Sequence, residues 1–586
     1  MYKLGGILIV EIANYPTPTE SGLKRRLGEF TSLAEALDYA AQGQSGINFY
    51  SAKGVLLESL PYSLLKEQAK ETAGKLLTLG LKKGDRVAVI AESDSDFSRI
   101  FFACQYAGLI PAPMPLPVAF AGKSAYINTL RGMIHNATAK AVITAQTIQS
   151  WTPEIIDGFS LCFGGTPEEL MAIKADKDIE LPIIDSDDIS YLQFSSGSTR
   201  FPMGVAVTQK ACLANVYAIA KYGLVVRETG DRCVSWLPLY HDMGLVGFFI
   251  TPVTCQLSID LLPTRDFARR PLVWLDIISR NKGTLSYSPS FGFELCARRA
   301  PTSTMELDLS SWRAAGIGGD MIRSHILEQF AIQYAQYGFS PKAFVASYGM
   351  AEATLALTFA PLDTGVKTDT VDLHILETDG IAKPCNDPHQ SVRTFVLCGP
   401  ILPGHEMEVR DEQGNILPER HVGSVFVRGP SLMKGYFHQE EETKRILSAD
   451  GWLRTGDLGY MLNNEIVITG REKDLIIING RNIWPQDLEW SAEHHFTALR
   501  SRDVAVFSVD TDEHESIVAL VQCRFLDPQD RQTLQEEMVN LFRRQHGVEV
   551  SVILVPPHSL PQTSSGKLTR ARARKMLLDG EFNISA

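Results

Sequence analysis

Residues 191–204, which read YLQFSSGSTRFPMG, decide how the rest of this chain is organised. They begin as an apolar strand and then break into the small residues Ser195, Ser196, Gly197, Ser198 and Thr199. Glycine lets the backbone approach an anion closely, and hydroxyl and backbone N–H groups donate to phosphate oxygens. A helical pattern begins soon afterwards, near Gln209. The stretch therefore predicts either a phosphate-binding loop or a polar surface turn, and the motifs downstream decide between the two.

The length and composition of the chain bound its class. A chain of 586 residues is too long for one core and predicts two or more domains. The hydrophobic share of 45% and the charged share of 21% are typical of a soluble globular protein. The net charge of -12 argues against a nucleic-acid partner, which usually requires a basic face. The nine cysteines form no Cys-x-x-Cys pair, so neither a zinc cluster nor a disulfide framework is indicated.

The sequence predicts no transmembrane segment, because no stretch approaches 18 uninterrupted apolar residues. The apolar run at residues 6–10 is too short for a signal core and has no basic flank before it. The default expectation is a cytoplasmic enzyme.

Helix and strand patterns alternate from Ser63 to about residue 222, which indicates layered α/β subdomains with a largely parallel sheet. The texture changes at about residue 393 to short strands with turns, which predicts a β-barrel-like part over residues 393–470. Residues 475–546 read as strand, helix, strands and helix, a small α+β unit.

Three motifs in the middle of the chain carry candidate chemistry. Residues 236–245 read WLPLYHDMGL and place His241 at a turn or helix start, although a lone histidine is more often structural. Gly318, Gly319 and Asp320 follow a strand pattern, where a flat ring can approach the backbone. The third motif, residues 347–352, reads SYGMAE. An aromatic residue followed by glycine at a strand's end suits a stacked adenine, and the closing glutamate is a hard oxygen ligand for Mg²⁺; the alternative is a buried tyrosine and a solvated glutamate.

Two motifs towards the C-terminus complete the set. Asp457, in the stretch WLRTGDLG, has acceptor capacity for two vicinal ribose hydroxyls. Lys567, in the stretch LPQTSSGK, is a point charge on a Ser/Gly loop and can act where negative charge builds up, although most lysines are merely solvated.

In this order along the chain, the motifs resemble the adenylate-forming (acyl-activating, AMP-binding) enzyme superfamily. The usual phosphate loop of that family carries a lysine where this chain has Met203. The version found here, with Arg200, Pro202 and Gly204 and no lysine, is similar to the fatty acyl-AMP ligase branch. The fold implied is a large N-terminal domain, residues 1–470, and a small mobile α+β lid, residues 471–586.

The resemblance also implies a role for each motif. Lys567 and His241 would be catalytic, Glu352 would hold Mg²⁺ and Lys473 would be the hinge of the lid. Besides the five residues of the phosphate loop, the nucleotide would be bound by Gly318, Gly319, Asp320, Ser347, Tyr348, Gly349, Met350, Asp457, Ile468 and Arg471. The implied reaction joins a fatty acid to the AMP part of ATP, releases pyrophosphate and passes the acyl group to the phosphopantetheine thiol of an acyl carrier protein.

Residues 356–378 resemble an insertion that distinguishes the fatty acyl-AMP ligases and is thought to restrain the lid motion that would serve CoA. A passive surface loop is the alternative. The basic run over residues 570–575 would dock an acidic carrier or simply be a solvated helix face. Competing functions are a fatty acyl-CoA synthetase, a peptide-synthetase-like enzyme that activates an amino acid, and a nucleotide-binding regulatory protein without catalysis.

Overall fold

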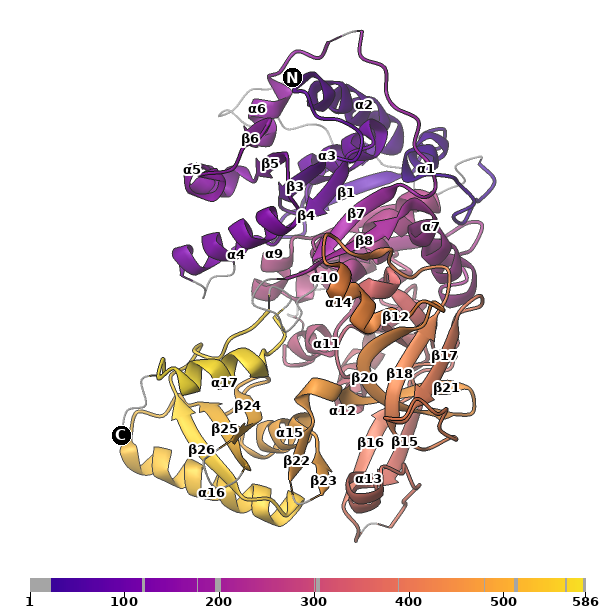
Figure 1. Cartoon of the computed structure of the whole chain (residues 1–586). Coiled ribbons are helices and arrows are strands. Elements are labelled where there is room, and N and C mark those ends of the chain that lie inside the picture. Colours follow the sequence, from indigo (N-terminus) through magenta and orange to yellow (C-terminus); the bar gives the residue numbers. More distant parts are fainter. Residues whose placement is uncertain are drawn as a thin grey trace.

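The computed structural model describes residues 23–117, 122–176, 178–194, 202–299, 301, 306–387, 389–478, 480–510, 515–563 and 566–582. Figure 1 shows the N-terminal α/β elements in one part of the molecule, the strand-rich region beside them and the C-terminal elements, coloured from orange to yellow, in the lower part of the view. Among the described residues, none of the helices combines the length and the apolar character needed to cross a bilayer.

The largest sheet has eight strands in the order β14-β13-β12-β11-β9-β10-β1-β2. Its interior pairs are parallel, and only the outer pairs β1/β2 and β13/β14 are antiparallel. The strands are β1 (Gly46–Tyr50), β2 (Leu56–Pro61), β9 (Arg232–Ser235), β10 (Ser258–Leu261), β11 (Leu285–Ser288), β12 (Ala314–Ile317), β13 (Phe344–Gly349) and β14 (Ala356–Phe359). The helices that follow them include α8 (Thr251–Thr254), α9 (Thr264–Arg269), α10 (Leu272–Asn281), α11 (Ser290–Ala297) and α12 (Ser324–Tyr334).

A second, four-stranded sheet is wholly parallel, in the order β4-β3-β5-β6. Its strands are β3 (Arg86–Ile90), β4 (Ile110–Pro113), β5 (Ala141–Thr144) and β6 (Phe163–Gly165). The helices of this region are α1 (Leu33–Ala40), α2 (Tyr62–Thr78), α3 (Ser95–Ala107), α4 (Lys123–Asn136), α5 (Thr152–Ile156) and α6 (Pro167–Met171). Helix α3 begins where the Asp94 carboxylate accepts from the backbone of Phe97, and it ends at Gly108 in the left-handed conformation that glycine favours. The predicted layered α/β architecture is confirmed.

The opening stretch of the sequence forms β7 (Ile189–Phe194) and β8 (Gly204–Thr208), which pair antiparallel with Phe194 opposite Gly204. β19 (Gly435–Tyr436) adds a third strand. The predicted phosphate loop, residues 195–199, connects β7 to β8 and lies outside the described residues. The Thr208 hydroxyl accepts from the backbone of Ala211 and so begins α7 (Gln209–Ala218) directly after the second strand.

The strand-rich region contains an antiparallel sheet of β17 (Glu406–Arg410), β18 (Gly423–Arg428), β20 (Leu453–Leu462) and β21 (Glu465–Arg471). Helix α14 (Glu440–Ile446) precedes β20. Beside this sheet, β15 (Thr368–Asp372) pairs antiparallel with β16 (Val392–Val396), and α13 (Leu373–Asp379) follows β15. The segment predicted as an insertion, residues 356–378, is therefore built into β14, β15 and most of α13.

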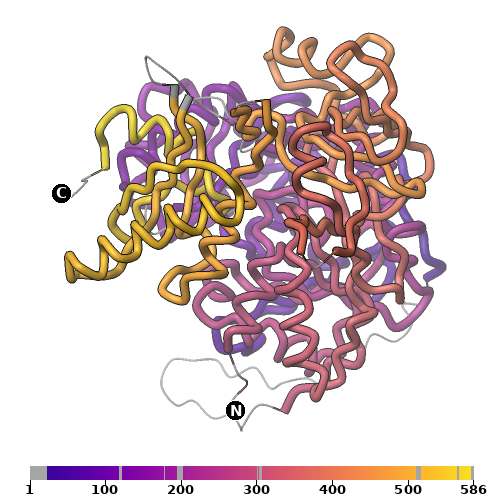
Figure 2. Tube along the Cα trace, turned by 90° about the horizontal axis from the view of Figure 1, so that it is seen from below, coloured from indigo at the N-terminus to yellow at the C-terminus, as the bar shows by residue number. Residues whose placement is uncertain are grey.

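The C-terminal elements lie together at one side of the molecule in both views (Figures 1 and 2). Their buried side chains, such as Leu488, Val506 and Met538, form clusters separate from the large N-terminal core. Trp484 is an exception, because it packs in a cluster with Phe395 and Tyr460. A domain boundary near residue 471 stays a prediction. The elements are β22 (Ile476–Ile478), β23 (Arg481–Ile483), α15 (Pro485–His495), β24 (Val504–Asp510), β25 (Glu515–Gln522), α16 (Pro528–His546), β26 (Val550–Val555) and α17 (Arg570–Leu578).

Candidate active site

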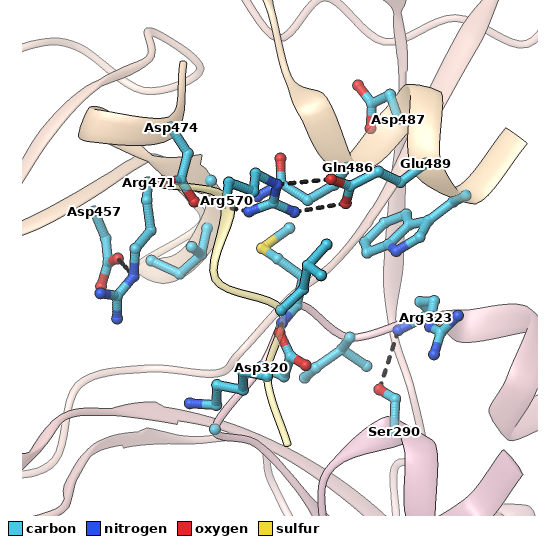
Figure 3. Close-up of a pocket in the computed structure, with 18 of the residues that line it drawn as sticks. Ser290, Asp320, Arg323, Asp457, Arg471, Asp474, Gln486, Asp487, Glu489 and Arg570 are labelled. Atoms are coloured by element: carbon cyan, nitrogen blue, oxygen red, sulfur yellow. Dashed lines mark hydrogen bonds and ion pairs between the residues drawn. The ribbon is translucent and has the colours of Figure 1, made fainter. Parts of the chain in front are cut away.

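A cavity of about 1000 Å³ lies between the C-terminal elements and the ends of the N-terminal strands. The structure brings to it the predicted residues His241, Gly319, Asp320, Ser347, Tyr348, Gly349, Met350, Glu352, Asp457, Ile468, Arg471, Lys473 and Lys567. Gly318 is not part of the lining. A Cβ atom at Gly318 would lie 2.9 Å from the Ser347 hydroxyl oxygen, so this glycine allows β12 and β13 to approach closely. Figure 3 shows the cavity with ten of its residues labelled, drawn from both halves of the chain.

Asp457 is held from two sides at the edge of the cavity. The pairing of β20 with β21 places Asp457 opposite Arg471, and Arg471 Nε lies 3.2 Å from the Asp457 carboxylate (Figure 3). The Tyr348 hydroxyl donates to the other carboxylate oxygen at 2.7 Å. The negative charge of Asp457 raises the pKa of Arg471, which therefore stays charged. A carboxylate has about four lone-pair sites, so two acceptor positions remain for vicinal hydroxyl groups.

Glu352 is almost fully buried, in the helical turn Ala351–Ala353 directly after β13. The Tyr436 hydroxyl donates to Glu352 Oε1 at 2.8 Å, which fixes the carboxylate. Burial raises the pKa of Glu352, and the tyrosine hydrogen bond opposes this rise. Glu352 thus presents one rigidly held carboxyl group to the cavity.

This arrangement suits Mg²⁺ bound largely by a substrate. Within the described residues, no group of three or more His, Cys, Asp or Glu side chains could hold a metal ion by itself. Mg²⁺ usually takes one or two carboxylates from the protein and completes its shell with substrate phosphates and water. One fixed carboxylate fits this donor set, and Phe194 and Met203, which flank the predicted phosphate loop in the sequence, line the same cavity.

His241 and Lys567 reach the cavity from opposite halves of the chain. The side-chain amide of Gln193, on β7, donates to the backbone oxygen of Tyr240 at 2.6 Å and fixes the peptide before His241. Burial, and then the positive charge of Lys567, lower the pKa of His241 to about 3. The imidazole is therefore neutral near pH 7, and the lysine ammonium is close enough to act on it.

Lys473 and Arg570 lie at the junction between β21 and the C-terminal elements. Lys473 belongs to the short helical turn Glu472–Asp474, and burial followed by the charge of Arg471 lowers its pKa. Arg570 lies 2.7 Å from Asp474 and 2.6 Å from Glu489, and Figure 3 shows it between them. Arg570 is therefore paired with these two carboxylates inside the protein and is not an exposed cation available for docking.

Sequence reasoning missed several residues of the site. Tyr436, Gln193, Arg323 and Arg502 all line the cavity. Gln193 lies in the opening stretch but was given no role there, and the other three belong to none of the motifs. Each of the four contacts a residue far away in the sequence. Only the folded chain identifies them.

The cavity is lined by residues of the large α/β body and by residues of the C-terminal unit. The sequence pattern of the AMP-binding enzyme family matches residues 47–437, and the chain belongs to that family.

The comparisons also locate the chain among its relatives. It is 52% identical to a Caulobacter vibrioides protein provisionally named an acyl-CoA synthetase, over 97% of this chain and 98% of the relative. It is 32% identical to the medium-chain-fatty-acid–[acyl-carrier-protein] ligase JamA of Moorena producens, over 95% and 96%. A structure from a study of fatty acyl-adenylate ligases of E. coli and L. pneumophila matches with a TM-score of 0.91 and 44% identity, over 95% of this chain and 99% of that one. The predicted resemblance to the fatty acyl-AMP ligase branch is confirmed.

Proposed function

We propose that this enzyme joins a fatty acid to AMP and then passes the acyl group to the phosphopantetheine thiol of an acyl carrier protein. The observation that carries the proposal is the position of Lys567, which lines one cavity with His241 and Glu352. The names of the relatives, which include a fatty acyl-carrier-protein ligase and fatty acyl-adenylate ligases, support a fatty acid as the substrate.

In the first step, a carboxylate oxygen of the fatty acid attacks the α-phosphorus of ATP. The bond from that phosphorus to the bridging oxygen breaks, its electron pair leaves with pyrophosphate, and a mixed anhydride of acyl group and AMP remains. Lys567 would stabilise the negative charge that builds up on the α-phosphate. Neutral His241 would orient the incoming carboxylate without taking up a proton.

In this proposal the same cavity is also the nucleotide site. Asp457 and Arg471 would hold the ribose hydroxyls, and Tyr348 would stack against the adenine. Residues 195–199 would hold the phosphates. Glu352 would hold Mg²⁺, which when bound neutralises phosphate charge. The remaining contacts to the nucleotide would come from Gly318, Gly319, Asp320, Ser347, Gly349, Met350 and Ile468.

In the second step, a thiolate sulfur attacks the acyl carbonyl carbon, the bond to the phosphate oxygen of AMP breaks, and AMP leaves. Lys567 has no part in this attack, so we propose that the C-terminal unit rotates about Lys473 and withdraws it. Such a motion separates the two steps in one active site.

Two ion pairs favour a carrier protein over CoA as the acceptor. Glu377 of α13 lies 2.5 Å from Arg481 of β23, and Arg393 of β16 lies 2.9 Å from Asp487 of α15. Both tie the proposed insertion and its flank to the C-terminal unit. A tethered lid supports the idea that free CoA, which brings no protein surface to assist the rotation, is a poor acceptor.

The experiment supplies labelled fatty acids and ATP with either CoA or a phosphopantetheinylated carrier protein. Labelled acyl carrier is expected, with far less acyl-CoA. Rapid acyl-CoA formation would instead assign the enzyme to the acyl-CoA synthetases, as the name of the Caulobacter relative suggests. Pyrophosphate exchange with amino acids but not with fatty acids would indicate an amino-acid-activating enzyme. ATP binding without acid-dependent release of pyrophosphate would indicate a regulatory protein.

A further inference from the structure

Arg502 connects the two halves of the active site. It lies in the turn between α15 and β24, and its side chain lines the cavity. The guanidinium lies over the ring of Phe291, 4.3 Å from its centre, and 3.7 Å from the carboxylate of Asp320. Phe291 belongs to α11, and Asp320 follows β12. One side chain of the C-terminal unit thus contacts the N-terminal wall of the cavity at two points.

The same guanidinium also holds the loop that carries the catalytic lysine. Arg502 Nη1 donates to the backbone oxygen of Gly566, the residue before Lys567. Gly566 has a φ of 75°, and a Cβ atom there would lie 3.0 Å from Arg502 Nη1. Glycine therefore lets the guanidinium approach the loop closely. Arg502 contacts the lysine loop and the nucleotide wall at the same time.

The backbone of Arg502 is held in an unfavourable conformation. Its φ is 69°, in the left-handed region that residues with a Cβ atom seldom adopt. The carboxylate of Glu493 accepts the backbone N–H of Arg502, which maintains the turn. Such conformations persist where the surroundings enforce them, and they cluster at functional sites.

A second arginine holds the same turn from the opposite half. Arg323 donates to the hydroxyl of Ser501 at 2.7 Å and lies 3.7 Å from Glu493. Its side chain is 11% exposed, and it also pairs with Glu294 at 3.0 Å. The turn at residues 501–502 is therefore held by two arginines. Arg323 extends from the N-terminal part to this turn, and Arg502 extends from the turn to the N-terminal part.

We propose that Arg502 is a positioning residue for Lys567, which seats the lysine loop during adenylate formation and releases it for acyl transfer. This inference rests on the proposed function, because it needs the two steps to use different positions of the C-terminal unit. Arginine suits the task, because its planar fork can stack on a ring and donate in its own plane. A lysine ammonium is a point charge and cannot make both contacts with the same geometry.

The test separates the two steps in the variants Arg502→Ala, Arg502→Lys and Phe291→Leu. Acid-dependent pyrophosphate release reports the first step, and consumption of synthetic acyl-adenylate by a phosphopantetheinylated carrier reports the second. R502A is expected to slow the first step about 100-fold, as misplacement of a catalytic group does, and to leave the second within about twofold. R502K and F291L are expected to show the same split with smaller losses.

The decisive readout is the double variant with Lys567→Ala. If Arg502 acts through the lysine, R502A slows the K567A enzyme no further. Equal losses in both steps, or full additivity with K567A, would overturn the proposal. Arg543→Ala is the matched control, because Arg543 pairs with Glu549 inside the C-terminal unit, and it should leave both steps unchanged.

The wild-type enzyme tests the proposed function separately. If it releases pyrophosphate with an amino acid and not with a fatty acid, the substrate is wrong. The Arg502 comparison is then made with the acid that is activated, and its outcome retains its meaning.

Discussion

The Tyr348 hydroxyl donates to Asp457 at 2.7 Å and so joins β13 of the large sheet to β20 of the strand-rich region. Burial, and then the charge of Asp457, raise the pKa of Tyr348, so the phenol remains a donor at every working pH. The contact aims the carboxylate at the place where the ribose is expected.

Tyr348→Phe removes this hydrogen bond and keeps the ring for stacking. Hydrogen bonds to charged groups contribute about 1.5–3 kcal/mol, so the KM for ATP should rise at least about tenfold. The KM for the fatty acid should change little. Pyrophosphate release measured against ATP concentration checks this, and an unchanged KM for ATP would remove Tyr348 from ribose positioning.

His241 predicts a specific loss of stability in acid. Its pKa is about 3 in the folded protein and about 6.5 when unfolded, so below pH 6.5 the unfolded chain binds a proton that the folded chain does not. Stability from this group is present above pH 6.5 and is lost as the pH falls towards 3. When the pH is lowered from 7.5 to 5.5, the melting temperature of His241→Gln should therefore fall less than that of the wild type. Equal losses in the two proteins would contradict the lowered pKa.

The ion pair between Arg481 and Glu377 should hold the C-terminal unit in place and so disfavour CoA as the acyl acceptor. Arg481→Gln leaves Glu377 buried without its partner, and removal of one partner from a buried pair is strongly destabilising. The tethered position of the C-terminal unit should become less populated, and acyl-CoA formation should rise several-fold relative to acyl transfer to a carrier. Arg543→Gln, whose partner lies in the same unit, is the control. An unchanged ratio of the two products would show that the segment at residues 356–378 has no part in the choice between CoA and the carrier.

As part of the proposed function, helix α17 would dock an acidic carrier protein. Arg572, Lys575 and Leu578 are exposed on it, and the helix contains no acidic residue. Arg572→Glu with Lys575→Glu should raise the KM for the carrier about tenfold or more at low salt, and the effect should shrink as salt screens the charges. Pyrophosphate release without carrier should stay the same. Lys444→Glu with Arg445→Glu on α14 is the matched control, and equal effects from both pairs would disprove a specific surface on α17.

The sequence predicted the architecture well, because it depends on local pattern. The alternation of helix and strand predicted from Ser63 onwards is present in the structure, where the strands β3, β4 and β5 alternate with the helices α3 and α4. The motif at residues 347–352 was expected at a strand's end, and the first part of it is itself strand. β13 continues to Gly349, because Ser347 and Tyr348 pair with β14. Strand pairing of this kind is not visible in a local pattern.

The candidate site was predictable where residues fall in recognisable motifs. It was not predictable where a contact spans the fold. Tyr436 lies 84 residues from Glu352, and Arg570 lies 81 residues from Glu489. The basic run at the C-terminus indicated four similar cations, but only packing shows that Arg570 is an internal ion-pair partner while Arg572 and Lys575 face solvent.

The central claim is that Lys567 in this cavity drives the joining of a fatty acid to AMP. The most direct measurement is the rate at which acyl-adenylate forms from a fatty acid and ATP, followed by mass spectrometry in the wild type and in Lys567→Ala. The account predicts acyl-adenylate in the wild type, a loss of about 100-fold or more in the variant, and ATP binding that is nearly unchanged. Equal rates of acyl-adenylate formation in the two proteins, or no acyl-adenylate in the wild type, would contradict it.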